Sequence, residues 1–147
     1  MSARFDLLID TNVIIDYAVR SRPAHADAVE LFEEAAEADD VRLMVLVSSL
    51  KDAYYIMCRA YGDEPTARDV LRRVSKTFFV VVDLLAAYAD DAFASDEPDF
   101  EDGLVRVAAE RLGVHAIVTR DALAFAGSFV KAVPPVEATA WIRQRCK

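Results

Sequence analysis

Cysteine, glycine and long hydrophobic runs are all scarce in this sequence. The two cysteines, Cys58 and Cys146, belong to no CxxC motif and no Cys/His cluster, which argues against a disulfide framework or a zinc site and indicates free thiols in a reducing cytoplasm. The four glycines form no glycine-rich phosphate loop. No apolar stretch approaches the roughly 20 residues of a membrane span, and the first residues lack the features of a signal peptide. We therefore expect a cytoplasmic protein without a membrane segment.

Basic charge is also in short supply. The chain has 17 Lys and Arg against 25 Asp and Glu, a net charge of −8. This balance argues against non-specific binding to nucleic acids, which depends on basic surface, but it leaves room for a nuclease whose acidic residues are gathered in a metal site. The most basic stretch contains Arg68, Arg72 and Arg73. Its pairs Glu64–Arg68 and Asp69–Arg73 are typical of a solvated helix face, and contact with phosphate is the alternative.

Strand-like and helix-like segments alternate along the whole chain. This alternation favours a parallel sheet with helices on both faces. At 147 residues and 54% hydrophobic content, we expect one domain, residues 1–147, with a sizeable core. Strands are predicted at 5–9, 41–47, 78–82, 114–118 and 130–133, and helices at 13–19, 24–37, 50–61, 63–76, 84–94, 99–112 and after Pro134-Pro135.

Four aspartates share one kind of position, just beyond the carboxyl end of a predicted strand or in the first turn of a helix: Asp10, Asp52, Asp102 and Asp121. Because these ends lie at one edge of a parallel sheet, we expect the four carboxylates to meet in one cleft. Two like charges about 4 Å apart repel by roughly 4 kcal/mol at an effective dielectric constant near 20, so such a cluster calls for protons or cations. Mg²⁺ or Mn²⁺ suits oxygen ligands and activates water against a phosphodiester.

Each of these aspartates also has a purely structural interpretation. Ser49-x-x-Asp52 matches a capping box, the helix dipole favours an acid at Asp102, and Asp121 can be a turn residue. Asp10 is harder to explain in this way, because turn chemistry does not require Asp-Thr-Asn after a buried strand. The prediction therefore depends on the joint placement of the four.

The remaining titratable residues suggest no competing chemistry. The two histidines are far in sequence from the four aspartates, and there is no Ser/His/Asp or Cys/His motif. Asp6, Asp16 and Asp83 are expected at the surface or in turns. Asp99 is expected to cap a helix or to support the neighbouring Asp102.

Four motifs occur in order along nearly the whole chain: Leu8-Ile9-Asp10-Thr11-Asn12-Val13, Ser48-Ser49-Leu50-Lys51-Asp52, Asp99-Phe100-Glu101-Asp102 followed by Ala108-Ala109, and Val118-Thr119-Arg120-Asp121. Together they resemble the PIN-domain family, in particular the short VapC-like toxin ribonucleases. The resemblance implies a three-layer α/β/α sandwich with a central parallel sheet. It also implies a Mg²⁺- or Mn²⁺-dependent endoribonuclease that acts on RNA, forms a homodimer and is held inactive by a small antitoxin.

The same resemblance assigns roles to residues of this chain. Asp10 and Asp102 would be the principal metal ligands, with Asp121 as a further one. Arg120 would neutralise a neighbouring carboxylate or contact the substrate. Asp52 would complete the catalytic acids, at a position that is usually glutamate in the family. The supporting residues would be Thr11, Asn12, Asp99 and Thr119.

Two other functions fit parts of the sequence. The shorter side chain of Asp52 is consistent with a PIN-like fold that has lost catalysis and acts through protein contacts. A receiver-like signalling domain would use Asp83 as phosphoacceptor, with Thr119 and Lys131 nearby. Against it, the first strand is followed by no adjacent acidic pair, and two helices rather than one separate the first two strands.

Overall fold

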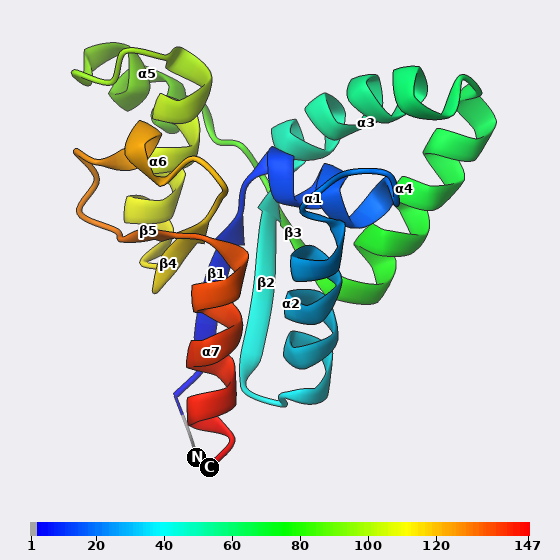
Figure 1. Cartoon of the computed structure of the whole chain (residues 1–147). Helices are drawn as coiled ribbons and strands as arrows, with labels where there is room; N and C mark the ends of the chain where they lie inside the picture. Colours follow the sequence, from blue (N-terminus) through cyan, green and yellow to red (C-terminus); the bar gives the residue numbers. More distant parts are fainter. Residues whose placement is uncertain (1–2) are drawn as a thin grey trace.

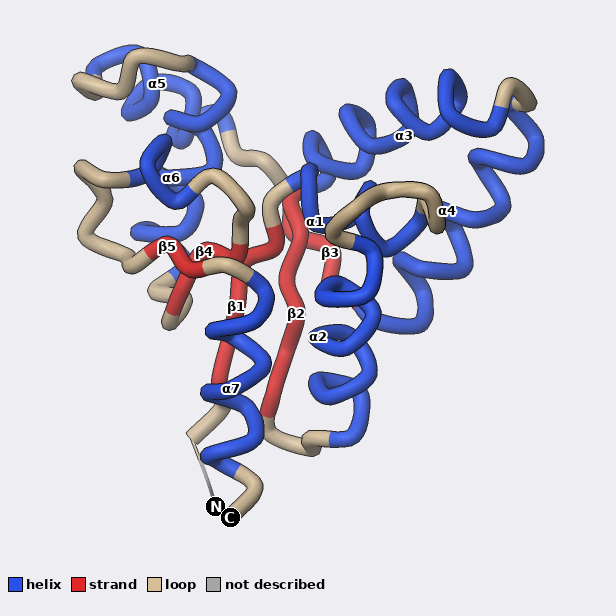
Figure 2. Tube along the Cα trace, in the orientation of Figure 1, coloured by secondary structure: helices blue, strands red, loops and turns tan. Residues whose placement is uncertain are grey.

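A five-stranded parallel sheet forms the middle layer of the computed structural model, which describes residues 3–147 (Figure 1). The strand order is β3-β2-β1-β4-β5, and every neighbouring pair is parallel. Helices flank the sheet on both sides (Figure 2), so the predicted three-layer α/β/α class is confirmed. The strands are β1 (Phe5–Ile9), β2 (Val41–Leu46), β3 (Phe79–Val82), β4 (Ala116–Val118) and β5 (Ala132–Val133).

The helices divide between the two faces of the sheet. One face packs against the first four helices and the last, and the other face against the fifth and sixth. None of the helices within residues 3–147 is long and apolar enough to cross a membrane. The helices are α1 (Thr11–Ala18), α2 (His25–Glu37), α3 (Val47–Tyr61), α4 (Glu64–Phe78), α5 (Ala86–Ala94), α6 (Phe100–Leu112) and α7 (Pro135–Arg145), and a 3₁₀ turn, η1 (Ala122–Phe125), follows β4.

The central strand β1 explains why the sheet needs helices on both faces. Leu7 and Ile9 pack on the side of α1, α2 and α7, whereas Leu8 packs on the side of α5 and α6. All three side chains are at most 1% exposed. A strand buried on both faces is a nearly continuous apolar run, as this one is from Leu7 to Ile9.

Several boundaries differ from the predicted ones. β4 and β5 are shorter than 114–118 and 130–133, because Val114 and Val130 pack in the core without joining the strand ladder. The predicted serine cap of α3 is wrong. The helix begins at Val47, directly after β2, and Ser49 lies inside it and is 3% exposed. The chain thus turns into the helix before either serine can cap it.

The strand order also excludes the receiver-like alternative. Flavodoxin-like domains, to which receivers belong, have the order 2-1-3-4-5, which places the third strand beside the first. Here β3 is an edge strand beyond β2. Asp83, which follows β3, therefore lies away from the centre of the sheet.

Candidate active site

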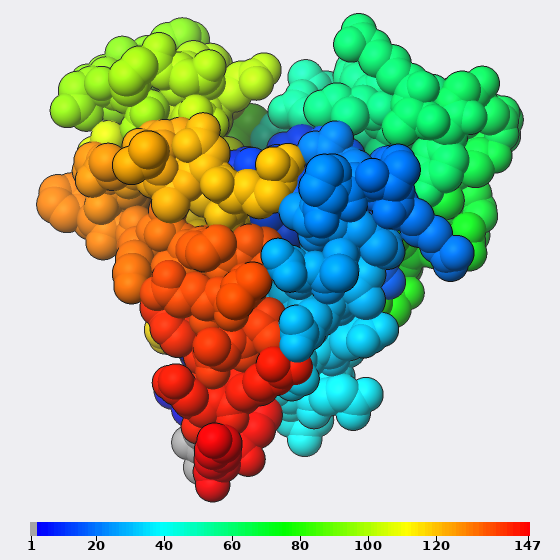
Figure 3. Space-filling view, viewed as in Figure 1, coloured from blue at the N-terminus to red at the C-terminus, as the bar shows by residue number. Residues whose placement is uncertain are grey.

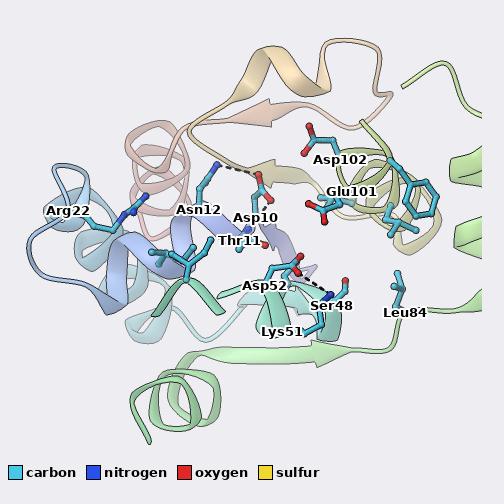
Figure 4. A pocket seen from close by; sticks show the side chains of 16 residues that line it. Asp10, Thr11, Asn12, Arg22, Ser48, Lys51, Asp52, Leu84, Glu101 and Asp102 are labelled. Atoms are coloured by element: carbon cyan, nitrogen blue, oxygen red, sulfur yellow. Dashed lines mark hydrogen bonds and ion pairs between the residues drawn. The ribbon is translucent and has the colours of Figure 1, made fainter. Parts of the chain in front are cut away.

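A cavity of about 540 Å³ opens at the carboxyl edge of the sheet, where β1 and β2 end. In the space-filling view the surface is hollowed between the part formed by α5 and the part formed by α3 and α4 (Figure 3). The cavity wall includes four carboxylate residues, supplied by the end of β1, by α3 and by α6: Asp10, Asp52, Glu101 and Asp102 (Figure 4).

Asp10 is fixed at the junction between β1 and α1. Its backbone N–H donates to Val118 O at 3.0 Å, which carries the β1–β4 pairing one residue further. Its Oδ1 accepts the N–H of Thr11 at 2.8 Å, as an N-cap does, and its Oδ2 accepts the Thr119 hydroxyl at 2.8 Å. Burial raises the pKa of Asp10, the bonds from Thr119 and Thr11 oppose that rise, and the negative charge of Asp121 adds to it.

Asn12 and Thr119 connect Asp10 to the segment after β4. The Asn12 amide N–H donates to Asp10 Oδ2 at 3.4 Å and to the Thr119 hydroxyl at 3.2 Å, and its Oδ1 accepts the N–H of Arg120 at 3.3 Å. Thr119 is fully buried and also accepts the N–H of Asp121 at 3.0 Å. The structure therefore places these two predicted supporting residues around Asp10, while Thr11 contributes its backbone N–H.

Asp102 faces the cavity from the first turn of α6. Asp99 caps this helix by accepting the N–H of Asp102 at 3.0 Å, so the capping role expected of Asp99 is present. Burial raises the pKa of Asp102 to about 6, with further contributions from the negative charges of Asp99, Asp10, Glu97 and Asp121. An acid whose ionised form is disfavoured by both burial and like charges is one that a cation would stabilise.

Asp52 lines the cavity from α3, and the helix-capping interpretation of this residue is wrong. It lies in the second turn of the helix, and its Oδ1 is 3.3 Å from Lys51 Nζ. Its side chain is 32% exposed. Asp52 is therefore free to face a ligand in the cavity rather than committed to the end of the helix.

Asp121 lies beside this cavity but is not part of its wall. It follows Thr119 in the turn after β4 and makes no side-chain cap at η1. Its negative charge nevertheless contributes to the raised pKa of both Asp10 and Asp102. The fold thus brings the four predicted aspartates to one edge, three of them in the cavity wall.

Sequence reasoning missed three residues of this region. Asp16, expected at the surface, is 1% exposed, and it pairs with Arg22 and Arg120. Arg22 and Glu101 both line the cavity. The only sequence signal for Glu101 was its place beside Asp102, and nothing in the sequence connected Arg22 with the site.

The donor set of the cavity is all oxygen, which suits Mg²⁺ or Mn²⁺. Across residues 3–147, no three His, Cys, Asp or Glu side chains stand close enough together to form a ready-made metal site. Mg²⁺ is commonly held by only one or two carboxylates, with water and substrate phosphate as its other ligands. The residues that fit this arrangement are Asp10 and Asp102, whose pKa values are both raised.

Comparison with known protein families gives one match over most of the chain. A family model described as PIN domain matches residues 6–123, most of the chain. Among curated protein sequences, none matches this chain.

Solved structures with the same fold include several toxin–antitoxin proteins. One is VapC20 from Mycobacterium tuberculosis, described as a sarcin-ricin loop cleaving toxin, with 16% identity and a TM-score of 0.68 over 83% of this chain and 95% of that chain. VapBC2 from Rickettsia felis, bound to a DNA fragment from its promoter, has 13% identity and a TM-score of 0.68 over 88% and 98%. A toxin–antitoxin complex from Klebsiella pneumoniae has 21% identity and a TM-score of 0.61 over 91% and 98%. At these identities the likeness is one of fold.

Proposed function

Because this chain belongs to the PIN-domain family, we propose that it is a Mg²⁺- or Mn²⁺-dependent endoribonuclease that hydrolyses phosphodiester bonds of RNA. The main support is that Asp10, Asp52 and Asp102 line one cavity at the carboxyl edge of the sheet. Burial and neighbouring negative charges raise the pKa of Asp10 and of Asp102. A cation among these carboxylates would remove that unfavourable interaction.

The proposed catalytic acids are Asp10, Asp52, Asp102 and Asp121, with all but Asp52 as metal ligands. A divalent ion bound there would polarise the scissile phosphodiester and lower the pKa of an attacking water. The chain's own contribution is to hold the ligands in place. The residues proposed for that support are Thr11, Asn12, Asp99 and Thr119.

We also propose a biological setting. Residues 1–147 would form one domain of a cytoplasmic toxin, which acts as a homodimer and is held inactive by a small antitoxin. The support is that structures of the same fold include a toxin described as cleaving the sarcin-ricin loop and a toxin–antitoxin complex.

The first test is the substitution Asp10→Asn, which keeps the shape of the side chain and removes its charge. We expect RNA cleavage in Mn²⁺ to fall by more than about 100-fold, the upper end for loss of even an outer-shell partner of a metal ligand. Because Asn can still cap α1, the far-UV circular dichroism and the cooperativity of melting should be retained. The measurement is single-turnover cleavage of RNA with and without Mn²⁺.

The matched control is Asp69→Asn, the same change at a carboxylate on α4 that pairs with Arg72 and Arg73. It should leave cleavage unchanged. If folded Asp10→Asn protein cleaves as fast as the parent, the assignment of the active site is wrong.

A second candidate function is a PIN-like protein that binds partners without catalysis. It is favoured by Asp52, which is one methylene shorter than the glutamate usual at this position in the family. It is also favoured by the spacing of the acids, because no three of them within residues 3–147 are close enough together to form a ready-made metal site. Titration calorimetry with Mn²⁺ separates the two, because the proposed nuclease must bind the ion in an Asp10-dependent manner and a non-catalytic scaffold need not.

A further inference from the structure

A buried carboxylate beside the cavity holds two arginines that come from distant parts of the chain. Asp16, in α1, is 1% exposed. Its Oδ1 accepts Nε of Arg22 at 2.7 Å, and its Oδ2 accepts Nε of Arg120, 104 positions away in the sequence. Each oxygen therefore serves a different guanidinium, and the three groups together carry a net positive charge.

The backbones that carry these arginines are also held. In the connection between α1 and α2, Arg22 N donates to Val19 O at 3.1 Å, and His25 N donates to Arg22 O at 3.0 Å. His25 Nδ1 lies 2.9 Å from the backbone oxygen of Asp16. On the other side, the N–H of Arg120 donates to Asn12 Oδ1. Each guanidinium group is therefore held at two points, by the hydrogen bonds of its own backbone and by its Nε contact with Asp16.

The outer nitrogens of the two guanidinium groups remain available. Within the part of the chain that the structure describes, neither guanidinium makes a side-chain hydrogen bond or ion pair other than the one to Asp16, and the side chains of Arg22 and Arg120 are 33% and 40% exposed. A guanidinium whose Nε is already engaged still presents two Nη groups, a donor arrangement that matches phosphate oxygens.

The position of Arg22 relates this pair to the carboxylates. Arg22 lines the same cavity as Asp10 and Asp102. Figure 4 shows Arg22 at one end of the view and Asp102 with Glu101 at the other, with Asp10 and Asn12 between them. A nucleic-acid strand that crossed the cavity with one phosphate at the carboxylates would therefore carry the next phosphates toward the arginines.

We propose that Arg22 and Arg120 bind backbone phosphates of single-stranded RNA next to the scissile bond, and that Asp16 is the positioning residue for both. The proposal rests on the proposed function, since it places the scissile phosphate at the carboxylates. It also gives a chain with a net charge of −8 a local basic contact for RNA, because two guanidinium groups lie together at the cavity and share one buried carboxylate.

The test is binding of a short fluorescent single-stranded RNA in EDTA, where no cleavage occurs. Arg22→Gln and Arg120→Gln should each weaken binding by about tenfold, the effect of losing one charge-assisted hydrogen bond. Each should also reduce the slope of log K against log salt by about 0.7 between about 50 and 200 mM. In cleavage assays with Mn²⁺, KM should rise while kcat changes by less than about threefold, because the contact is formed in the ground state as well.

Asp16→Asn tests the positioning role through the sign of its effect. Removal of a negative charge should tighten RNA binding if Asp16 acts only as an electrostatic neighbour. If Asp16 positions the arginines, binding should weaken despite the more positive charge. Should Asp16→Asn fail to fold, the two surface variants Arg22→Gln and Arg120→Gln still decide the proposal.

The matched control is Arg68→Gln, at an arginine on α4 that is 74% exposed and paired with Glu64. It should change RNA affinity by less than about twofold, because an exposed charge outside the contact region is largely screened by salt. The proposal is overturned if Arg68→Gln weakens binding and Arg22→Gln and Arg120→Gln do not. If the parent binds RNA through Arg22 and Arg120 but never cleaves it, the proposed function fails, and only the phosphate-binding role of the two arginines stands. If cleavage depends on Asp10 but both arginine variants bind RNA as tightly as the parent, this inference fails and the proposed function stands.

Discussion

Two carboxylates of the cavity, Asp10 and Asp102, and two carboxylates that pair with arginine, Asp6 and Asp69, have opposite electrostatic environments. Asp6 in β1 faces Arg42 in β2, its partner in the strand register, and two bonds of 2.6 Å from that guanidinium lower the pKa of Asp6. Arg72 and Arg73 likewise lower the pKa of Asp69. By contrast, burial raises the pKa of Asp10 and of Asp102.

This difference separates acids that stabilise the fold from acids that the fold tolerates. A carboxylate paired with arginine favours the folded state at neutral pH, whereas one that is buried among like charges disfavours it. The fold places arginines beside the cavity, but Asp16 holds them instead of the carboxylates that line it. Among the cavity carboxylates, Asp52 pairs with Lys51, and Asp10 and Asp102 are left for a positively charged ligand.

The contrast between cavity acids and arginine-paired acids can be broken by removing the charge of a cavity acid. The largest expected effect is on catalysis, in the variant Asp102→Asn. We expect loss of about 100-fold or more in cleavage and in Mn²⁺ affinity, since a proposed metal ligand is removed. The matched control is Asp99→Asn, three residues earlier, where Asn caps α6 as well as Asp does and cleavage should fall by less than about fivefold. Mn²⁺ calorimetry and single-turnover cleavage measure both effects. Equal losses in the two variants would show that general negative charge, rather than ligation by Asp102, matters.

A smaller effect is expected from lengthening the half-buried acid that α3 contributes to the cavity, through Asp52→Glu. The added methylene lengthens the reach of a carboxylate that lines the same cavity as Asp10 and Asp102 and now lies 3.3 Å from Lys51 Nζ. We expect Mn²⁺ affinity to rise by about threefold to tenfold, because cation affinity depends on the number and charge of oxygen ligands in reach. Asp52→Gln supplies the same reach without charge and should give no gain. An unchanged affinity for Asp52→Glu would mean that even the longer carboxylate at this position does not reach the ion.

The sequence predicted the layers of the fold but not the ends of all strands. Strand and helix patterns predicted the alternation because burial on both faces makes the inner residues of a strand such as β1 a continuous apolar run. The same patterns overextended β4 and β5, since Val114 and Val130 are apolar for core packing and take no part in the strand pairing. An apolar residue pattern predicts which residues are buried, but it does not predict which of those buried residues form the hydrogen bonds of the sheet.

The sequence also predicted the candidate site better on its strand side than on its helix side. Asp10, Asn12 and Thr119 follow strand ends, and parallel pairing of β1 with β4 is enough to bring them together. Asp16 could not be recognised as buried, because its charge suggests solvent until Arg22 and Arg120 are known to reach it. That contact depends on how the segment after α1 and the turn after β4 meet in space, which no local pattern encodes.

The smallest expected effect is on the pH dependence of stability in EDTA, and it has opposite signs in the two sets of acids. The pKa of Asp102 is raised from 3.8 to about 6 in the folded protein, so the folded state binds more protons than the unfolded state between these values. Stability should therefore decrease as pH rises through this window. Asp102→Asn removes that decrease, so the melting temperature of the variant should exceed that of the parent by about 2 °C above pH 6. This is roughly the shift that a solvent-screened half to one kcal/mol gives a chain of this size. The gain should vanish near pH 4.

Asp6, whose pKa is lowered by Arg42, should behave in the opposite way. Asp6→Asn should melt below the parent at neutral pH, and its deficit should shrink as acid protonates Asp6 in the parent. Thermal melts of the three proteins across this range measure the effect, and a gain for Asp102→Asn that does not depend on pH would show that its cause is packing rather than charge.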